Sequence, residues 1–534
     1  MSEHIDFDAI VVGAGFSGLY ALYQLRERGL RVRVLDMAEN VGGTWYWNRY
    51  PGARTDSTSD VYQYWFSDEL LKEWQWSERF AGQEETERYL NYVADKFDLR
   101  RDIQFKTRVV GADFDETGEY WTVSTEAGEK LSAQFLVMST GPLTELVLPD
   151  YPGIESFSGE WYHTARWPKQ PVDFTNKRVG IFGTGATGIQ VIQTIAPQVG
   201  SLKVFQRTPT YTIPMKNPKI EDSEREAKLA RYAELKDRVH TTFSGAEFDF
   251  DERSIYDLDE DARRARMEEL WQDGSLAYWV GSFREVFTDE RAGELFSEFA
   301  REKIRARVND PEVAEKLVPK SYLFGTRRVP LETGYYEAYN RDNVELVDLR
   351  ETPIECITPT GIKTTAEEYE LDMIIYATGF DAGTGALTHV DIRGRNGELL
   401  RDAWADGIRS FMGLQVNGFP NMFMTGAPLS PAAAFCNVPT CVQQQLDWIS
   451  DCIEFVRSGN AHTIEPTAQA EADWVAHHEE IAKMITVTKS NSWYMGSNID
   501  GKARGLLAYA GGVDVYRQRC DEVKEGGYQE FALS

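Results

Sequence analysis

The chain has 534 residues, 42% of them hydrophobic and 12% aromatic, which is enough to bury a large core in two or three domains. Its formal charge of −28 argues against a nucleic-acid partner or an anionic membrane, because both require a cationic face. Without a basic N-terminal segment or a stretch of roughly 18 apolar residues, the chain is expected to be cytoplasmic and free of membrane spans.

Cysteine and histidine usage argues against two further kinds of site. The five cysteines never occur as CxxC, which indicates free thiols rather than a disulfide framework or a dithiol redox centre. The seven histidines include no HxH or HExxH pair, and the adjacent His477 and His478 lie in an acidic helical stretch. No metal site is therefore predicted.

Residues 7–12 (FDAIVV) are predicted to form an apolar strand that leads into a GxGxxG turn at 13–18 and then into a helix. This order is typical of a dinucleotide-binding unit. The glycines permit a tight turn, a close approach of the pyrophosphate and helix-on-strand packing, and the helix N-terminus receives the phosphates. The next strand ends at Asp36, whose carboxylate suits the ribose hydroxyls of FAD or NAD and repels a 2′-phosphate.

A second glycine turn and a run of aromatic residues follow that strand. The glycine pair at 42–43 precedes Thr44, Trp45, Tyr46 and Trp47. A nicotinamide does not need such a segment, whereas a large flat isoalloxazine ring must be held along its length. The first unit is therefore assigned to FAD, with simple packing as the alternative for Tyr46 and Trp47.

The second GxGxxG turn, at 183–188, follows the predicted strand 178–182 (RVGIF) and opens a helix. The next strand ends at Arg207 and Thr208. A guanidinium beside a hydroxyl suits a 2′-phosphate, because arginine can bind phosphate oxygens bidentately. The second cofactor is therefore predicted to be NADPH, with a surface arginine at a strand end as the alternative.

With both cofactors in one chain, the reaction must begin with hydride transfer from nicotinamide to flavin. The reduced flavin then needs an acceptor. A disulfide reductase would need a cysteine pair near the flavin motif, and no cysteine precedes Cys356. Oxygen is the remaining common acceptor for such a chain.

Residues 213–321 are charged and helical in pattern, and they predict a helical insertion. The segments 133–143 and 371–381 resemble each other, since each is an apolar strand that ends in a Thr-Gly turn, and the chain is expected to cross between the two units there. The predicted fold is α/β with two Rossmann-like dinucleotide-binding domains. They comprise an FAD domain of residues 1–142 and 382–534, an NADP domain of residues 150–212 and 322–381, and the helical insertion 213–321.

Between the two units lies a connector rich in aromatic residues, 157–168 (FSGEWYHTARWP), predicted to be neither a clean helix nor a clean strand. It fits the pattern FxGxxxHTxxWP through Phe157, Gly159, His163, Thr164, Trp167 and Pro168. Further motifs are GGTWYWNRYPGARTD (42–56), FGTRRVPLETGYYEAYNRDNV (324–344), ATGFD (377–381) and NSWYMGSNIDGK (491–502). With these motifs the chain resembles, over nearly its whole length, the type I Baeyer–Villiger monooxygenases, which use FAD and NADPH.

The resemblance implies that NADPH reduces FAD, that O₂ adds to the flavin C4a, and that the peroxyflavin converts a ketone into an ester or lactone. It places the fixed positive charge that a peroxyflavin needs on Arg328, with Asp56 as the carboxylate that orients it. It also places Arg327 towards the 2′-phosphate of NADP. On the residues alone, Arg327 and Arg328 could be a solvated basic pair, and Asp56 could cap a helix at 57–66.

The motifs and the resemblance together imply a set of catalytic and cofactor-binding residues. The resemblance puts Arg54 and Thr55 near NADP and lets Trp493 close over the nicotinamide half, although a core tryptophan is the alternative. The expected catalytic residues are Arg328 and Asp56. The expected cofactor-binding residues are Gly13, Gly15, Ser17, Gly18, Asp36, Thr44, Trp45, Tyr46, Trp47, Arg54, Thr55, Asp56, Tyr62, Val109, Gly183, Gly185, Ala186, Thr187, Gly188, Ile189, Gln190, Val191, Arg207, Thr208, Arg327, Arg328, Val438 and Trp493.

The chain departs from many members of the family at 424–439 (MTGAPLSPAAAFCNVP), which looks longer than the usual turn near the substrate. The stretches 215–218, 240–250 and 329–339 look more like the branch that acts on acetone and other small aliphatic ketones. The expected substrates are O₂ and a small aliphatic or cyclic ketone, and the protein is expected to be a monomer or weak oligomer.

Two other functions remain open on the sequence. A heteroatom oxygenase acting on N or S would use the same cofactors, although the His-Thr and Trp-Pro of the connector weigh against it. A flavin reductase or redox-sensing protein would not need Asp56, Arg328 and a closing tryptophan together. His163 is expected to fix the connector as the domains move with NADP, rather than to act as a general base.

Overall fold

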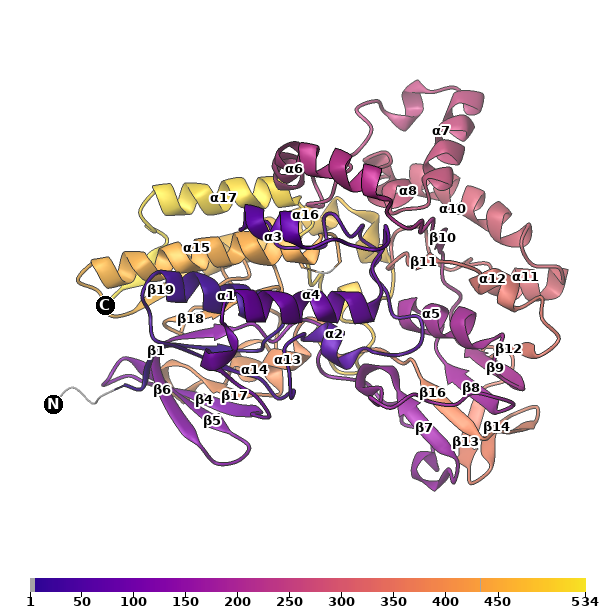
Figure 1. Cartoon of the computed structure of the whole chain (residues 1–534), viewed down its shortest axis with the longest axis horizontal. Coiled ribbons are helices and arrows are strands. Elements are labelled where there is room, and N and C mark those ends of the chain that lie inside the picture. Colours follow the sequence, from indigo (N-terminus) through magenta and orange to yellow (C-terminus); the bar gives the residue numbers. More distant parts are fainter. Residues whose placement is uncertain (1–4, 433) are drawn as a thin grey trace.

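The computed structural model describes residues 5–432 and 434–534 and contains two large sheets (Figure 1). The first sheet consists of β1 (Phe7–Val12), β2 (Val32–Leu35), β3 (Ile103–Gln104), β4 (Val109–Asp115), β5 (Tyr120–Thr125), β6 (Lys130–Met138), β17 (Asp391–Arg393) and β18 (Met422–Met424). Its strand order is β17-β4-β5-β6-β1-β2-β3, and β18 also pairs with β6. The apolar strand β1 lies between β2 and β6 and runs parallel to both. Such a strand is buried on both faces, which explains its nearly unbroken apolar sequence.

The second sheet is parallel throughout, in the order β12-β9-β8-β16-β7. It consists of β7 (Glu160–His163), β8 (Arg178–Phe182), β9 (Ser201–Gln206), β12 (Val344–Asp348) and β16 (Met373–Tyr376). The connector 157–168 was predicted to be neither a clean helix nor a clean strand, and strand β7 shows that residues 160–163 of it form a strand. Its four residues pair with β16 on one side only, so this strand is set by its neighbour and not by an alternating apolar pattern of its own.

Each glycine turn joins a central strand to a helix. Helix α1 (Phe16–Glu27) follows β1, and helix α5 (Ala186–Ile195) follows β8. A long helix near the C-terminus, α15 (Val438–Ser458), packs along α1 (Figure 1). The Tyr20 hydroxyl and the Gln24 amide of α1 both donate to the Asp447 carboxylate of α15, at 2.6 and 2.7 Å. The C-terminal part of the chain thus returns to the first sheet.

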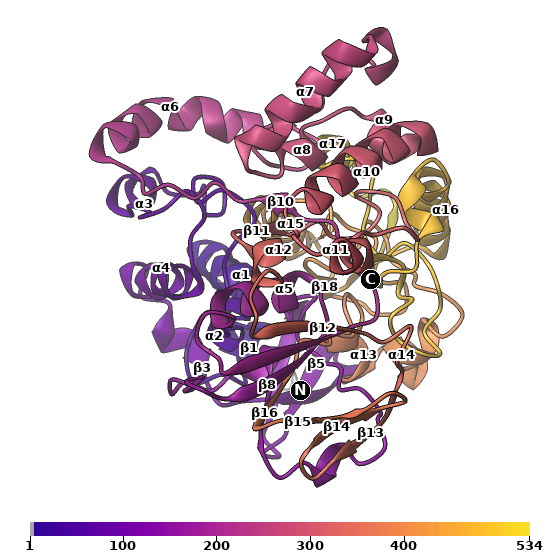
Figure 2. The same ribbon diagram turned by 90° about the vertical axis from the view of Figure 1, so that its right-hand side faces the viewer.

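The residues between the two halves of the second sheet form a helical layer. It contains α6 (Asp222–Thr241), α7 (Glu260–Asp273), α8 (Ala277–Val280), α9 (Glu285–Thr288), α10 (Glu290–Arg305) and α11 (Pro311–Leu317). Figure 2 shows α6 and α7 at the top of the molecule, above the sheets. The short strands β10 (Ile213–Pro214) and β11 (Leu331–Glu332) pair where the chain enters and leaves this layer. Fold class and the two Rossmann-like units are as predicted.

Local sequence explains why the helical layer packs as it does. In α10 the Asp289 carboxylate caps the first turn by accepting from the backbone N–H groups of Arg291 and Ala292. Phe296 and Phe299 then fall on the buried face of the helix. They belong to the same hydrophobic cluster as residues of β8 and β9, so the insertion and the second sheet share one core.

Two connections run side by side between the sheets. In the first connection, residues 139–149, the Val147 N–H donates to the carbonyl oxygen of Gly379 at 3.0 Å. Gly379 belongs to the second connection, which contains residues 377–381. The Asp381 N–H donates in return to the Glu145 carbonyl oxygen at 2.8 Å. These bonds join the two segments whose Thr-Gly turns the sequence marks as crossing points.

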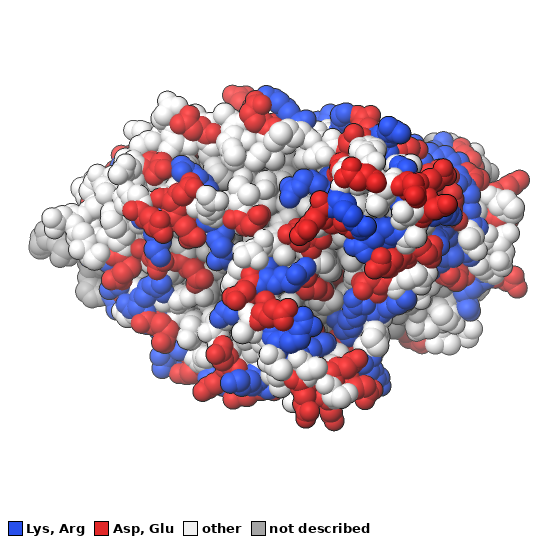
Figure 3. Space-filling model, turned by 90° about the horizontal axis from the view of Figure 1, so that it is seen from above, with Lys and Arg blue, Asp and Glu red and all other residues white. Residues whose placement is uncertain are grey.

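The surface carries charges of both signs. Figure 3 shows Asp and Glu side chains interspersed with Lys and Arg side chains over the face that it presents. Within the part of the chain that the structure describes, no helix is long and apolar enough to cross a membrane.

Candidate active site

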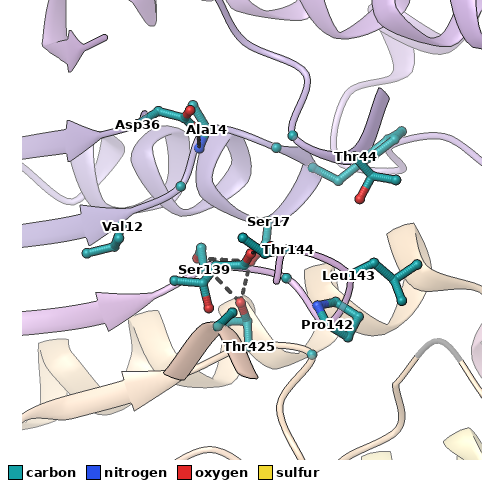
Figure 4. Close-up of a pocket in the computed structure, with 18 of the residues that line it drawn as sticks. Val12, Ala14, Ser17, Asp36, Thr44, Ser139, Pro142, Leu143, Thr144 and Thr425 are labelled. Atoms are coloured by element: carbon teal, nitrogen blue, oxygen red, sulfur yellow. Dashed lines mark hydrogen bonds between the residues drawn. The ribbon is translucent and has the colours of Figure 1, made fainter. Parts of the chain in front are cut away.

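Two cavities open at the carboxyl ends of the central strands of the two sheets, where each glycine turn leads into a helix. The first cavity has a volume of about 250 Å³ and follows the 13–18 turn. Figure 4 shows side chains from β1, the α1 turn and the 139–144 connection converging on it. The predicted residues that line this cavity are Gly13, Gly15, Ser17, Asp36, Thr44, Trp45, Trp47, Tyr62, Val109 and Val438.

Polar groups at the base of this cavity are arranged to take a phosphate-bearing ligand. Helix α1 has no side-chain cap, so its first N–H groups are not satisfied by a capping side chain. The Ser17 hydroxyl contacts the hydroxyls of Ser139 and Thr425 at 3.0 and 2.5 Å (Figure 4). An uncapped helix N-terminus with hydroxyls beside it fits the pyrophosphate of FAD.

Asp36 lines the cavity and also holds its glycine turn in shape. Its two carboxylate oxygens accept from the backbone N–H groups of Ala14 and Ala38, at 2.5 and 2.7 Å. Burial raises the pKa of Asp36 although these two hydrogen bonds oppose the rise. Contact between Asp36 and a ribose stays a prediction.

The second cavity, of about 940 Å³, follows the 183–188 turn. The predicted residues that line it are Thr44, Trp45, Arg54, Thr55, Asp56, Tyr62, Gly183, Gly185, Ala186, Thr187, Gln190, Arg207, Thr208, Arg327, Arg328, Val438 and Trp493. Helix α5 also lacks a side-chain cap. A Cβ placed on its N-cap residue, Gly185, would meet none of the described atoms within 4 Å apart from its chain neighbours, so a ligand has room to approach the backbone there.

Two arginines make one end of this cavity positive. Arg327 and Arg207 both line it, and the Nε of Arg327 is buried with no hydrogen-bond partner among the described residues. Burial lowers the pKa of Arg327, and the charge of Arg207 lowers it further, while Tyr322 opposes the change. Two guanidinium groups that repel each other fit a doubly charged anion such as a 2′-phosphate.

The Arg328–Asp56 pair predicted from the family motif is formed in the second cavity. Nη2 of Arg328 donates to Oδ2 of Asp56 at 2.9 Å, and Oδ1 accepts from the backbone N–H of Leu331 at 3.3 Å. Residues 57–66 form no helix, so the alternative that Asp56 caps one there is wrong. Burial alone would lower the pKa of Arg328, but the Asp56 carboxylate and Tyr494 together outweigh this effect and the pKa is raised.

The helical insertion also contacts the Arg328 guanidinium. The ring of Trp279, on α8, lies 5.8 Å from the guanidinium carbon. Trp279 in turn packs on Gly325, where an added Cβ would lie 2.6 Å from the indole Nε1. Gly325 also has a φ of +80°, so glycine is required there on two grounds. A quarter of the Arg328 side chain remains exposed, and the residue lines the cavity.

The two cavities meet close to this ion pair. Residues that line both are Thr44, Trp45, Tyr62, Pro142, Leu143, Cys436 and Val438. The Trp45 indole N–H donates to the Tyr62 hydroxyl at 3.2 Å, and Tyr62 is close enough to the Arg328–Asp56 pair to feel both charges. A ligand in the first cavity and one in the second would therefore meet beside Arg328.

Five predicted residues do not line either cavity in the described structure: Gly18, Tyr46, Gly188, Ile189 and Val191. Gly18 and Gly188 serve packing, because a Cβ on either would lie 1.7 or 2.1 Å from the carbonyl oxygen of Gly13 or Gly183. The Tyr46 ring packs against the side chains of Arg49 and Lys169. Arg54 does line the second cavity, but its guanidinium is already paired with Glu78 at 2.5 Å.

Several lining residues were not predicted. Ser139, Pro142 and Leu143 come from the first connection between the sheets, and Thr425 and Cys436 come from the 424–439 segment. The Thr-Gly turn at 140–141 was a usable signal, since it marks the carboxyl end of β6, and ligands bind at the carboxyl ends of such strands. Thr425 follows β18, a three-residue strand too short to predict.

His163 joins both connections between the sheets. Its Nδ1 accepts from the Ala165 N–H at 3.0 Å, so the ring proton is on Nε2. Nε2 lies 3.3 Å from the Val147 carbonyl oxygen and 3.3 Å from the Thr378 hydroxyl. Burial lowers the pKa of His163 to about 4. The hydrogen bond to Val147 opposes this change, whereas the Arg166 charge adds to it. The imidazole is therefore neutral and positioned between the two segments.

This neutral histidine makes the fold sensitive to acid. Unfolded His163 takes up a proton near pH 6.5, whereas the folded form resists until about pH 4, so its contribution is present above pH 6.5 and is lost as the pH falls. Between pH 7 and 5 the wild type should lose about 2 kcal/mol more unfolding free energy than His163→Gln. Urea unfolding at the two pH values measures the difference, and equal losses would contradict the assignment.

His163→Ala should disturb NADPH coupling more than flavin binding.

Comparison with known proteins fits this geometry. A family model for flavin-binding monooxygenase-like proteins matches residues 8–214. The chain is 53% identical over 528 residues to an acetone monooxygenase (methyl acetate-forming) of Gordonia sp. (strain TY-5), covering 99% of both chains. It is 39% identical over 529 residues to a cyclopentanone 1,2-monooxygenase of Comamonas sp. (strain NCIMB 9872), covering 99% of this chain and 96% of the relative.

Solved structures agree with the sequence relatives. The fold superposes on the crystal structure of OTEMO in complex with FAD and NADP with a TM-score of 0.96, at 40% identity and over 100% of both chains. The two Rossmann-like units, the family model and the neighbour with FAD and NADP define a flavin monooxygenase. The chain belongs to the Baeyer–Villiger monooxygenases, which confirms the resemblance seen in its motifs.

Proposed function

We propose that this enzyme oxidises small ketones to esters or lactones, with FAD in the first cavity and NADPH in the second. The observation that carries the proposal is the Arg328–Asp56 ion pair beside the place where the cavities meet. When bound, FAD takes a hydride from NADPH and activates O₂. The same cavities fit both groups, because each has an uncapped helix N-terminus for a pyrophosphate.

Arg328 supplies a fixed positive charge that Asp56 orients. Such a preorganised charge stabilises negative charge on oxygen without reorganisation at the moment of reaction, which is worth far more in a site that excludes water. Trp45 and Tyr62 line the junction and limit access of water there. His163 takes no part in proton transfer, because its imidazole is buried, neutral and in contact with both connections between the sheets.

Large rings around Arg328 favour a small ketone. Trp279 covers the guanidinium, and Tyr494 is close enough to interact with it. The ring of Phe435, which lines the second cavity, lies 5.3 Å from that of Tyr494. Acetone and cyclopentanone, the substrates named for two relatives, are both small ketones.

The assay for this proposal supplies NADPH, O₂ and one ketone at a time, and identifies products by gas chromatography. Acetone, butanone and cyclopentanone should give methyl acetate, ethyl acetate and a lactone, with kcat/KM at least about tenfold above that for phenylacetone. Sulfoxide from a thioether with no ester from any ketone would instead support the heteroatom oxygenase. The enzyme is expected to be cytoplasmic and to act as a monomer or weak oligomer. Size-exclusion chromatography tests the oligomeric state.

The cofactor preference gives a separate prediction. If Arg207 binds the 2′-phosphate, Arg207→Ala should raise KM for NADPH by about 10- to 100-fold, the range expected for one charge-assisted hydrogen bond, and leave KM for NADH unchanged. Lys203→Ala is the matched control, because Lys203 lies on β9, the strand that ends just before Arg207, but pairs with Glu345. Equal loss with both coenzymes would show that Arg207 does not read the phosphate.

A further inference from the structure

Two of the five cysteines lie in the wall of the first cavity. Cys436 and Cys441 both line it, and Cys436 lines the second cavity as well. No cysteine pair is expected near the flavin motif from the sequence, because more than 400 residues separate Cys436 and Cys441 from the 13–18 turn. The packing of α15 on α1 brings them there.

The two thiols occupy positions that face each other at a helix N-terminus. Helix α15 begins at Val438 with Asn437 as its N-cap, so Cys436 precedes the cap and Cys441 is the fourth residue of the helix. Side chains at these two positions pack against each other in the hydrophobic-staple arrangement. Burial raises the pKa of Cys441 well above its usual value, and the neighbouring Cys436 thiol raises it further.

The two cysteines differ in how a small molecule can reach them. Cys441 is 1% exposed, whereas Cys436 is half-buried and lines both cavities at their junction. An oxidant formed or held in the cavities would therefore meet Cys436 first, with Cys441 beside it to resolve the product. An accessible thiol with a second thiol next to it to resolve its oxidised form is an arrangement found in redox-sensing cysteines.

We propose that Cys436 and Cys441 are a peroxide-oxidisable pair that closes to a disulfide and switches off ketone oxidation. Hydrogen peroxide transfers one oxygen to the Cys436 sulfur, which gives a sulfenic acid and one water. The Cys441 sulfur then attacks that sulfur, its proton and the hydroxyl leave as a second water, and the disulfide forms. The pair loses two electrons, and the peroxide gains them.

The proposal rests on the proposed function only for the source of the peroxide. Reduced flavin and O₂ yield hydrogen peroxide when no ketone accepts the oxygen. The disulfide would tie the residue before the helix to its first turn, and it would move Val438, which lines both cavities. Consumption of NADPH without ketone would thus produce the peroxide that switches the enzyme off.

The test uses FAD-loaded full-length enzyme and hydrogen peroxide added without NADPH, so detection of the disulfide does not depend on the proposed reaction, whereas the activity readout does. After alkylation of free thiols, peptide mass spectrometry should find a Cys436–Cys441 linkage and alkylated Cys356, Cys452 and Cys520. Ketone oxidation should fall at least fivefold and recover with dithiothreitol. Each variant is compared with its own untreated activity.

Variants separate a disulfide from general oxidative damage. Cys441→Ser should lose activity without recovery, because the oxidised Cys436 has no resolving thiol and proceeds to the sulfinic acid. Cys436→Ser should resist the same treatment. Cys356→Ser, on the distant strand β13 (Ile354–Thr358), should behave as wild type. The proposal would be overturned if the enzyme lost activity while alkylation still found Cys436 and Cys441 as free thiols. Full recovery of the activity of Cys441→Ser with dithiothreitol would overturn it as well.

Discussion

Arg328→Ala should nearly abolish ester formation, with kcat for ketone oxidation reduced by about a hundred- to a thousandfold. Removing one preorganised charge or donor from an oxyanion-stabilising site costs about 10²–10³ in rate, and here no second cation pairs with Asp56 among the ion pairs of the described residues. Reduction of the flavin by NADPH should change much less. Stopped-flow reduction and gas chromatography of the product measure the two effects separately.

Stability has to be controlled in that experiment. Arg328→Ala leaves the 9%-exposed Asp56 carboxylate without its partner, and a broken buried pair costs about 3–5 kcal/mol. Flavin content and a thermal melt show whether the variant is folded, and Arg328→Lys keeps the charge while losing the planar fork. Lys should retain more activity than Ala. Ester production by a folded Arg328→Ala at near wild-type rate would refute the role of Arg328.

Two glycines of the second turn should respond in opposite ways to the same substitution. Gly188→Ala should destabilise the fold by about 3 kcal/mol, because its Cβ would lie 2.1 Å from the backbone oxygen of Gly183 and the helix would have to move away from the strand. Gly185→Ala has room for the methyl group and a φ of −79°, so the fold should tolerate it.

The cost of Gly185→Ala should fall on coenzyme binding. The methyl group would occupy the space through which a pyrophosphate approaches the backbone, and KM for NADPH should rise at least about tenfold. Urea unfolding and steady-state kinetics on the two variants give the comparison. A stable Gly188→Ala with unchanged KM, or a Gly185→Ala that binds NADPH normally, would contradict this division between packing and binding.

The parts of the fold that sequence predicts are those whose signals are local. Each GxGxxG turn lies next to its own strand and helix, and the arginine at the end of β9 follows from the same unit, so a few dozen residues contain all the information. Strand β7 escaped prediction because its four residues gain their conformation from pairing with β16, more than 200 residues away.

The site residues likewise divide into those with a local sequence signal and those that depend on contacts between distant segments. Asp56 and Arg328 are 272 residues apart, and only the family motif linked them before the structure showed their contact. The aromatic run leaves binding and packing both open for Tyr46, whose ring lies against Arg49, and its contact with the flavin stays a prediction. Cys436 and Cys441 could not be placed at all, because their position depends on how a C-terminal helix packs on α1.

The most direct test of the account is a single turnover. Enzyme reduced with one equivalent of NADPH without oxygen is mixed with O₂ and butanone, and ester and hydrogen peroxide are both quantified. We expect close to one ester per flavin in the wild type, and peroxide in place of ester in Arg328→Ala. Stoichiometric peroxide from the wild type, whichever small ketone is present, would contradict it.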